Sequence, residues 1–309
     1  MEFLRLLESI RTPALDTFFS AVTYFGDELL FMALAMLIFW CVDKRTGYYA
    51  FLVGLFGTLA NQFLKILCRI PRPWVLDPDF TIVESARAAA TGYSFPSGHT
   101  QNAVGTFGVL AVTTHRKWVR AVCIALIVLV PFSRMYLGVH TPLDVGVAFL
   151  LAAILVAAFY PAFRTQDAMK RSMPYLRYAA GIGAALFVIY VTNLQESGAA
   201  LDQANLDSAV KNAWTLLGTI AGLFLVYDID RCYIRFDTRA PLPGQICKLV
   251  LGLPLAVAIK TLLKAPLRAI LDAGPADAIR YLVLVLFVGC IWPLTFPFFA
   301  RLGRKKEDA

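Results

Sequence analysis

The sequence predicts an all-α fold, a polytopic bundle of membrane helices with about nine spans and an N-terminal interfacial or half-span segment. Of the 309 residues, 59% are hydrophobic and only 16% are charged, and the mean hydropathy is +0.65. Such values are typical of a protein that crosses the membrane several times and rare in a soluble domain. The net charge of +8 comes from cations in short loops between apolar runs, which indicates membrane topology and argues against a nucleic-acid partner.

The N-terminal segment, residues 1–26, is predicted to lie at the membrane interface. Residues 2–11 carry apolar side chains on one side with Glu and Arg between them, a pattern typical of a helix that lies on the membrane surface. Residues 14–25 are apolar but short, and Asp16 interrupts them. We expect a half-span or an interfacial hairpin there, and a single kinked span is the alternative. The first nine residues lack a basic region followed by an apolar core, so we expect no cleaved signal peptide.

Nine apolar runs follow this segment and are predicted to be membrane helices. Several are shorter than the ~20 residues that a perpendicular helix needs, so some must extend into the flanking loops. We divide the runs into a core at 27–163 and a four-span C-terminal extension at 164–309. The predicted spans are about 28–42, 47–69, 99–114, 118–137, 143–163, 176–193, 212–228, 246–263 and 280–299.

Lysine and arginine are unequally distributed between the two predicted faces. The loops 43–46, 115–120, 164–177 and 229–248 and the tail from 301 hold 17 of these residues, whereas the opposite face holds eight. Cytoplasmic loops are enriched in Lys and Arg. We therefore expect the first set of loops and the C-terminus to be cytoplasmic, with the chain in the plasma membrane.

The stretch PFSRMYLGVHTPLD, which begins at residue 131, places three ionisable groups beside long apolar runs: Arg134, His140 and Asp144. Such groups are costly there and usually functional. Thr141 is a good N-cap and Pro142 suits the first helical position, so His140 should lie just outside a helix start. Asp144, one turn inside, can reach back and hold the imidazole, as a nucleophilic or basic histidine requires. The alternative is structural, because Thr141-x-x-Asp144 is also a capping box.

Two further stretches carry groups of the same kind. YSFPSGHT, from residue 93, makes Ser97 an N-cap with a glycine and His99 in the first turn, and such a helix start binds anions through its N–H groups and dipole. KILCRIPRP, from residue 65, places Lys65 and Arg72 seven residues apart. Each also has a simpler interpretation, since Lys65 could snorkel to the interface and Arg72 could be a cation at the end of a loop.

Together these stretches describe a phosphate cradle of three cations and a helix N-terminus, with two histidines and a carboxylate as acid and nucleophile. The combination resembles the type-2 phosphatidic acid phosphatase superfamily, whose motifs are written K-x6-RP, PSGH and SR-x5-H-x3-D. All three motifs occur without substitution and in order, and the resemblance covers roughly residues 20–163. The matching residues are Lys65, Arg72 and Pro73, then Pro96, Ser97, Gly98 and His99, then Ser133, Arg134, His140 and Asp144.

The resemblance implies a phosphatase core of about six helices that hydrolyses a lipid phosphate monoester or pyrophosphate through a phosphohistidine. His140 is expected to attack phosphorus, His99 to protonate the leaving oxygen and Asp144 to hold His140. The residues expected to bind the phosphate are Lys65, Arg72, Ser97, Gly98 and Arg134. All three motifs fall on the face opposite the basic loops, so we expect the site on the extracytoplasmic side.

The resemblance also implies that no cofactor and no metal are needed, and we see no carboxylate cluster suited to magnesium. The six cysteines form no CxxC or Cys/His cluster, so neither disulfides nor a zinc site is expected. The expected partners are the bilayer and a lipid phosphate such as undecaprenyl pyrophosphate, phosphatidate, phosphatidylglycerol phosphate or a sphingoid phosphate. Two alternatives remain, namely a phosphotransferase with a lipid or sugar acceptor and a non-enzymatic lipid transporter or scaffold.

The extension at 164–309 has no motif that we can name. Its ionisable groups within the membrane are Lys260 and Lys264, which we interpret as snorkelling to the interface. The alternatives are a contact in a homodimer and a lipid entrance between helices.

Overall fold

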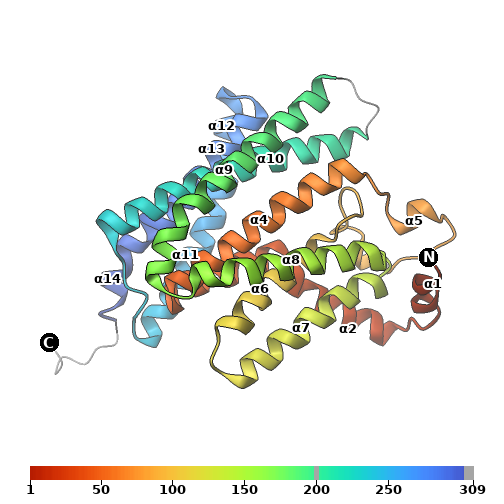
Figure 1. Ribbon diagram of the computed structural model, residues 1–309, viewed down its shortest axis with the longest axis horizontal. Helices are drawn as coiled ribbons and strands as arrows, with labels where there is room; N and C mark the ends of the chain where they lie inside the picture. Colours follow the sequence, from red (N-terminus) through yellow and green to blue (C-terminus); the bar gives the residue numbers. More distant parts are fainter. Residues whose placement is uncertain (198–201, 303–309) are drawn as a thin grey trace. The chain divides into compact units, whose positions relative to one another are not determined.

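The computed structural model describes residues 1–197 and 202–302, and within these ranges the chain is helical and contains no β-strand (Figure 1). The predicted all-α class is confirmed. The chain forms two compact units. The first comprises Met1–Met32, Tyr49–Thr165 and Ala200–Ser208, and the second comprises Ala33–Tyr48, Gln166–Ala199 and Ala209–Ala309. The domain boundaries drawn from the sequence, after residues 26 and 163, stay predictions, and most of the basic tail from 301 lies outside the described residues.

Seven of the described helices are long and apolar enough to cross a membrane, or eight if a bent pair counts as one span. The bent pair is Pro13–Gly26 with Glu28–Val42, at an angle of 51°, so the N-terminal segment is part of a broken span or a re-entrant loop. The predicted count of nine is not confirmed. The run at 99–114 forms α6, Gly98–Thr113, whose 16 residues extend only ~24 Å against the ~30 Å thickness of the hydrocarbon core.

The first unit begins with α1 (Glu2–Ser9), α2 (Pro13–Thr23), the short 3-10 turn η1 (Tyr24–Gly26) and α3 (Glu28–Leu37, in this unit up to Met32). In α1, Leu4 and Leu7 are buried while Phe3 and Leu6 are exposed. Apolar side chains exposed on a short amphipathic helix suit the membrane interface, and the interfacial position of residues 1–26 stays a prediction.

The body of the first unit consists of α4 (Lys44–Cys68, in this unit from Tyr49), α6, α7 (Lys117–Tyr136) and α8 (Pro142–Phe163). The connection from α4 to α6 contains the short helices α5 (Pro73–Leu76) and η3 (Glu84–Ala86). Helix α6 lies beside both α7 and α8 (Figure 1). A Cβ at Gly108 would come within 3.1 Å of Val156, so the missing side chain lets α6 and α8 approach closely. This packing brings the ends of the helices that carry the three motifs together.

The second unit contains the four predicted spans of the extension. They are α9 (Gln166–Glu196), α10 (Gln203–Ile229, in this unit from Ala209) with the π-helical turn η4 (Asp230–Ile234), α11 (Leu242–Leu262) with α12 (Lys264–Ile270), and a last span from α13 (Ala273–Leu286) through η5 (Phe287–Ile291) and η6 (Trp292–Thr295) to α14 (Phe296–Phe299). This unit also contains the π-helical turn η2 (Ile38–Val42) at the end of α3. An ion pair of 2.6 Å joins Arg177 and Asp228 between α9 and α10.

Candidate active site

His140 lies in the short connection between α7 and α8, as the sequence predicts. Gly138 has a φ of +81°, in the left-handed region that glycine adopts without strain, and this residue turns the chain after α7. Thr141 is the N-cap of α8 and Pro142 its first residue. The imidazole of His140 is only 2% exposed, so it is held by protein groups on nearly all sides.

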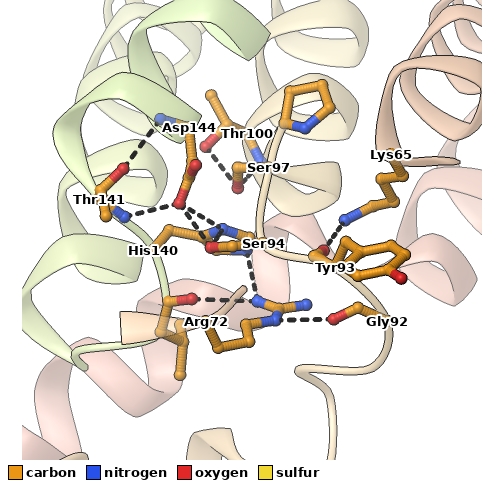
Figure 2. Close-up of polar contacts among 12 residues, drawn as sticks. Lys65, Arg72, Gly92, Tyr93, Ser94, Ser97, Thr100, His140, Thr141 and Asp144 are labelled. Carbon is orange, nitrogen blue, oxygen red and sulfur yellow. Dashed lines mark hydrogen bonds and ion pairs between the residues drawn. The ribbon is translucent and has the colours of Figure 1, made fainter. Parts of the chain in front are cut away.

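Asp144 contacts His140 and a serine that the sequence analysis had not assigned a role (Figure 2). Its Oδ2 lies 3.5 Å from Nδ1 of His140 and accepts hydrogen bonds from Ser94 Oγ at 2.5 Å and from the backbone N–H of Thr141 at 2.8 Å. Ser94 Oγ is also 3.4 Å from His140 Nδ1. The capping box is present as well. Asp144 therefore caps α8 and faces the imidazole at the same time, so the two interpretations of this residue do not exclude each other.

Arg72 determines the tautomer of His140. Its Nη1 lies 3.1 Å from Nε2 of His140. A guanidinium has only donors and keeps its protons in proteins, so Nε2 must accept and must carry the lone pair. The proton of the neutral ring then lies on Nδ1, on the side of Asp144 and Ser94. This is the arrangement that a nucleophilic Nε2 needs.

Three further N–H groups of Arg72 bind backbone carbonyls. Nε donates to Gly92 at 3.1 Å (Figure 2), Nη1 to Val139 at 3.0 Å and Nη2 to Thr91 at 2.6 Å. Lys65 Nζ donates to the carbonyl of the next residue in the same loop, Tyr93. These two cations therefore fix the loop before α6 against the connection that carries His140.

Arg134 differs from Arg72 because most of its donors are unused. The residue is fully buried, and its Nη1 donates to Thr23 Oγ1 at 2.7 Å. Its Nε and Nη2 have no hydrogen-bond partner among the described residues. A buried guanidinium with unsatisfied donors is costly unless a ligand completes it, so Arg134 is the strongest candidate for direct contact with an anion.

The N-terminus of α6 forms another side of the site. Ser97 Oγ accepts from the backbone N–H and the hydroxyl of Thr100, at 3.4 and 3.0 Å, which confirms Ser97 as the N-cap. The N–H of Ser97 donates to the carbonyl of Asp144 at 3.1 Å and joins α6 to α8. A Cβ built on Gly98 would meet no atom within 4 Å, so space for a ligand is open beside the first turn, where helix N–H groups bind anions.

Positive charge dominates the electrostatics of the site. Three cations act on the imidazole of His99, which lies in the first turn of α6. Arg134 has the largest electrostatic effect on this ring, followed by Arg72 and Lys65. Burial, and then the charges of Arg72, Arg134 and Lys65, lowers the pKa of His140 well below its usual value of 6.5. The nucleophile candidate is thus neutral at physiological pH, in a pocket whose excess positive charge suits a phosphate.

The sequence comparisons assign the chain to a family. A model of the PAP2 superfamily matches residues 45–168, and a model described as PAP2 superfamily phosphatase, transmembrane extension, matches residues 214–305. Phosphatidylglycerophosphatase B of Bacillus subtilis (strain 168) is 31% identical over 163 residues, which are 47% of this chain and 74% of that protein. The chain belongs to the PAP2 superfamily. This confirms the resemblance carried by the three motifs.

Two further proteins match about half of this chain. Sphingosine-1-phosphate phosphatase 2 of Mus musculus is 25% identical over 155 residues, 48% of this chain and 43% of that protein, so the chain spans less than half of that relative. The crystal structure of Aquifex aeolicus LpxE covers 51% of this chain and 92% of its own, with 28% identity and a TM-score of 0.45. The PAP2 chain described here is an integral membrane protein.

The structure of this PAP2 protein brings all of the predicted site residues into the first unit. Among the residues that contact them without having been predicted are Ser94 beside Asp144 and Thr23 beside Arg134. Ser94 lies within the stretch YSFPSGHT, but no spacing rule marks a serine at that position. Thr23 had no sequence signal, because it lies 111 positions before its partner.

No group of three or more His, Cys, Asp or Glu side chains that could hold a metal ion occurs among residues 1–197 and 202–302. Independence from metal ions, implied by the family resemblance, stays a prediction that a chelator can test.

Proposed function

We propose that this PAP2 protein hydrolyses a lipid phosphate monoester or pyrophosphate without a metal ion, through a phosphohistidine on His140. The observation that carries the proposal is the contact of Arg72 with His140 Nε2 at 3.1 Å. It requires a lone pair on Nε2, in a pocket where Arg134 offers two unused donors. A neutral nucleophile beside an unoccupied guanidinium is what phosphoryl transfer to histidine needs.

In the first step, Nε2 of His140 attacks phosphorus and the bond from phosphorus to the leaving oxygen breaks. His99, in its protonated form, gives a proton to that oxygen, so the lipid leaves as an alcohol or as a lipid monophosphate. The negative charge of the bound phosphate favours this protonated form against the cations around His99. The new N–P bond makes the imidazole ring positive. Asp144, 3.5 Å from Nδ1, stabilises this charge and keeps the Nδ1 proton in place.

In the second step, water attacks phosphorus from the side that the leaving group vacated. The now neutral His99 takes a proton from the water, the N–P bond breaks and its electron pair returns to Nε2. Inorganic phosphate leaves and His140 is again neutral. Both steps concentrate negative charge on the phosphoryl oxygens, which fixed donors stabilise without reorganisation.

The phosphoryl oxygens are proposed to bind Arg134, Ser97, Gly98, Arg72 and Lys65. Arg134 supplies its Nε and Nη2. Ser97 accepts two bonds from Thr100, which leaves its own hydroxyl proton to donate. Arg72 contributes the N–H that faces Nε2 in the resting site. Lys65 contributes chiefly charge, because its Nζ already binds a carbonyl.

The lipid nature of the substrate and the side of the membrane belong to the same proposal. The relatives named above include phosphatidylglycerophosphatase B and sphingosine-1-phosphate phosphatase 2, and three of the helices around the site, α4, α7 and α8, are long enough to span a bilayer. The excess of Lys and Arg in the loops away from the motifs supports an extracytoplasmic site.

A panel of lipid phosphates tests the proposal. The purified protein is offered phosphatidate, phosphatidylglycerol phosphate, undecaprenyl pyrophosphate and a sphingoid phosphate, with EDTA present and no added acceptor, and released inorganic phosphate is measured. We expect release from at least one substrate, loss of release in His140→Ala, and unchanged release in His115→Ala, because His115 is exposed beyond the other end of α6. No release by folded wild type, or normal release by His140→Ala, would contradict the proposal. Release only after an acceptor is added would favour a phosphotransferase.

A further inference from the structure

A part of the chain outside the matched family region contacts the active site. The PAP2 model matches residues 45–168, whereas α2 and η1 occupy residues 13–26. The last residue of α2, Thr23, is 8% exposed and accepts the hydrogen bond from Arg134 Nη1 at 2.7 Å. An N-terminal helix therefore touches one of the three motifs directly.

The contact with Thr23 decides which edge of the Arg134 guanidinium remains available. A guanidinium binds two oxygens side by side through either of two edges, the pair of Nη atoms or the pair Nε and Nη2. Thr23 accepts from one of the two N–H groups of Nη1, so the first edge is partly used by the protein. Nε and Nη2 form the second edge, and both are buried without a partner among the described residues. Thr23 thus leaves intact the edge on which neither nitrogen has a protein partner, and this edge can hold two phosphoryl oxygens.

Packing holds Thr23 in this position from two sides. Phe19, one turn earlier in α2, packs its ring 4.4 Å from that of Tyr136 at the end of α7, and the Tyr136 hydroxyl donates to Asp16 at 2.8 Å. On the other side, Gly26 fits against the start of α6, where a Cβ would come within 2.7 Å of the His99 carbonyl. The segment is therefore fixed to the helix that carries Arg134 and to the helix that carries His99.

We propose that Thr23 is a positioning residue of the active site, which locks Arg134 so that its Nε and Nη2 face the phosphoryl group. The inference rests on the proposed phosphatase function. It also makes α2 a functional part of the enzyme. Thr23 itself touches no substrate atom and acts only through Arg134.

The alternative is that Thr23 merely satisfies one donor of a buried arginine, with no consequence for the ligand. Both roles predict some loss of stability when the hydroxyl is removed. Only the positioning role predicts weaker binding of a phosphate mimic by protein that is still folded, and only that role makes the effect of Thr23 depend on an arginine at 134.

The test compares Thr23→Val, which keeps the shape and removes the hydroxyl, with Thr23→Ser, which keeps the hydroxyl. The matched control is Thr17→Val on the same helix, because Thr17 is exposed and its hydroxyl donates to the helix carbonyl of Pro13. The dissociation constant for orthovanadate, a phosphate mimic, is measured for each variant. The values of kcat and KM are measured with the best lipid phosphate and with a soluble phosphate ester.

We expect Thr23→Val to lower kcat/KM about 10- to 100-fold, the factor for loss of a hydrogen bond to a charged group, and to weaken vanadate binding by a similar factor. Thr23→Ser and Thr17→Val should remain within about threefold of wild type. In an Arg134→Lys background, Thr23→Val should have little further effect, because residues that act as a unit are not additive. Thermal unfolding of each variant shows whether the protein tested is folded.

The outcomes separate this inference from the function on which it rests. If wild type neither releases phosphate nor binds vanadate, the proposed function fails and the inference fails with it. If wild type does both and Thr23→Val behaves like wild type, only the inference about Thr23 is wrong. It is also wrong if Thr23→Val and Arg134→Lys have independent, multiplicative effects. If Thr23→Val does not fold, Thr23→Ser is the deciding variant. This variant keeps the hydroxyl, so its vanadate affinity should stay close to that of wild type. A 10- to 100-fold weaker affinity of Thr23→Ser would contradict the role proposed for the hydroxyl.

Discussion

Ser94 donates its hydroxyl proton to Oδ2 of Asp144 at 2.5 Å, and both side chains are fully buried. The oxygen that faces the imidazole of His140 is thus held by neutral donors, Ser94 and the backbone N–H of Thr141, and no Lys or Arg among the described residues forms an ion pair with it. Asp144 consequently keeps its negative charge available for the imidazolium that forms when His140 attacks phosphorus. Arg72, which contacts the opposite nitrogen of the ring at 3.1 Å, completes a row of groups that orients His140 from both ends.

Replacing Asp144 by Asn should separate its catalytic role from its role as a helix cap. The amide oxygen of Asn can still accept from the backbone N–H of Thr141, so α8 keeps its cap. The negative charge beside Nδ1 is lost, and we expect kcat to fall on the order of 10²- to 10⁴-fold, as when an orienting carboxylate is neutralised in other enzymes. Measured kcat and thermal unfolding together test this. A normal kcat would leave Asp144 as a capping residue only.

Ser94→Ala should lower kcat by about tenfold. The change removes one donor to Asp144 Oδ2 while the Thr141 N–H remains, so the carboxylate is less well fixed and the ring of His140 gains freedom. KM should change little, because Ser94 contacts none of the proposed phosphate ligands directly. Ser85→Ala, in the same loop but exposed and bonded to Ser20, is the matched control. An equal loss in both variants would point to general loosening of the loop.

The pH dependence of kcat/KM should show an acid limb well below pH 6.5. The nucleophile acts only when neutral, and burial with nearby cations lowers the pKa of His140 well below its usual value. Activity is therefore retained as the pH falls through 6.5 and is lost only when His140 finally binds a proton. A phosphate monoester itself gains a proton near pH ~6, so two substrates with different phosphate pKa values must be compared. If the acid limb stays at pH 6.5 or above with both substrates, the pKa of His140 is not lowered as proposed.

Orthovanadate should inhibit the enzyme and EDTA should not. Vanadate copies the five-coordinate phosphorus of the transition state, and the unused Nε and Nη2 of Arg134 are placed to bind it. We expect Arg134→Lys to weaken vanadate inhibition by about 10- to 100-fold, because lysine cannot form the two-pronged contact. Inhibition curves for wild type and variant measure this. Loss of activity in EDTA that added magnesium restores would contradict the metal-independent mechanism.

Much of the site could be predicted because its groups follow fixed spacing near helix ends. Thr141 and Pro142 start α8, so the position of His140 followed from capping rules. The partners of Lys65 and Arg72 could not be predicted. These are backbone carbonyls of residues 91–93, and a carbonyl is present at every position, so the residue type gives no signal.

The boundaries and number of the spans show a second limit of the sequence. Hydrophobicity marks only the apolar middle of a helix, so the run at 176–193 became α9, which extends through polar ends to Gln166–Glu196. The bend of 51° after Gly26 depends on tertiary packing of α2 against α7, which no local pattern encodes. The same packing brings Thr23 to Arg134 across 111 positions of sequence.

Two native cysteines can test which side of the membrane the site faces. Cys68, the last residue of α4, and Cys232 in η4 are both exposed, and the other four cysteines are buried or half-buried. Five long helices, α6 to α10, lie between them along the chain, besides the short α5 and η3. Helix α6 is packed against α7, and the predicted site uses the first turn of α6 together with the last turn of α7. The start of α6 and the end of α7 therefore lie on the same side of the membrane, and α6 is counted as a crossing. An odd number of crossings puts the two cysteines on opposite sides.

We expect a membrane-impermeant maleimide to label Cys68 in intact cells and to reach Cys232 only after the membrane is permeabilised. Cys68 is three residues after Lys65, so its side is the side of the active site, and the Lys- and Arg-rich loops predict that this side is extracytoplasmic. Labelling of intact cells should therefore fall in Cys68→Ser and stay unchanged in Cys232→Ser. The reverse pattern would put the site in the cytoplasm. Labelling of both cysteines from one side would mean that α6 does not cross.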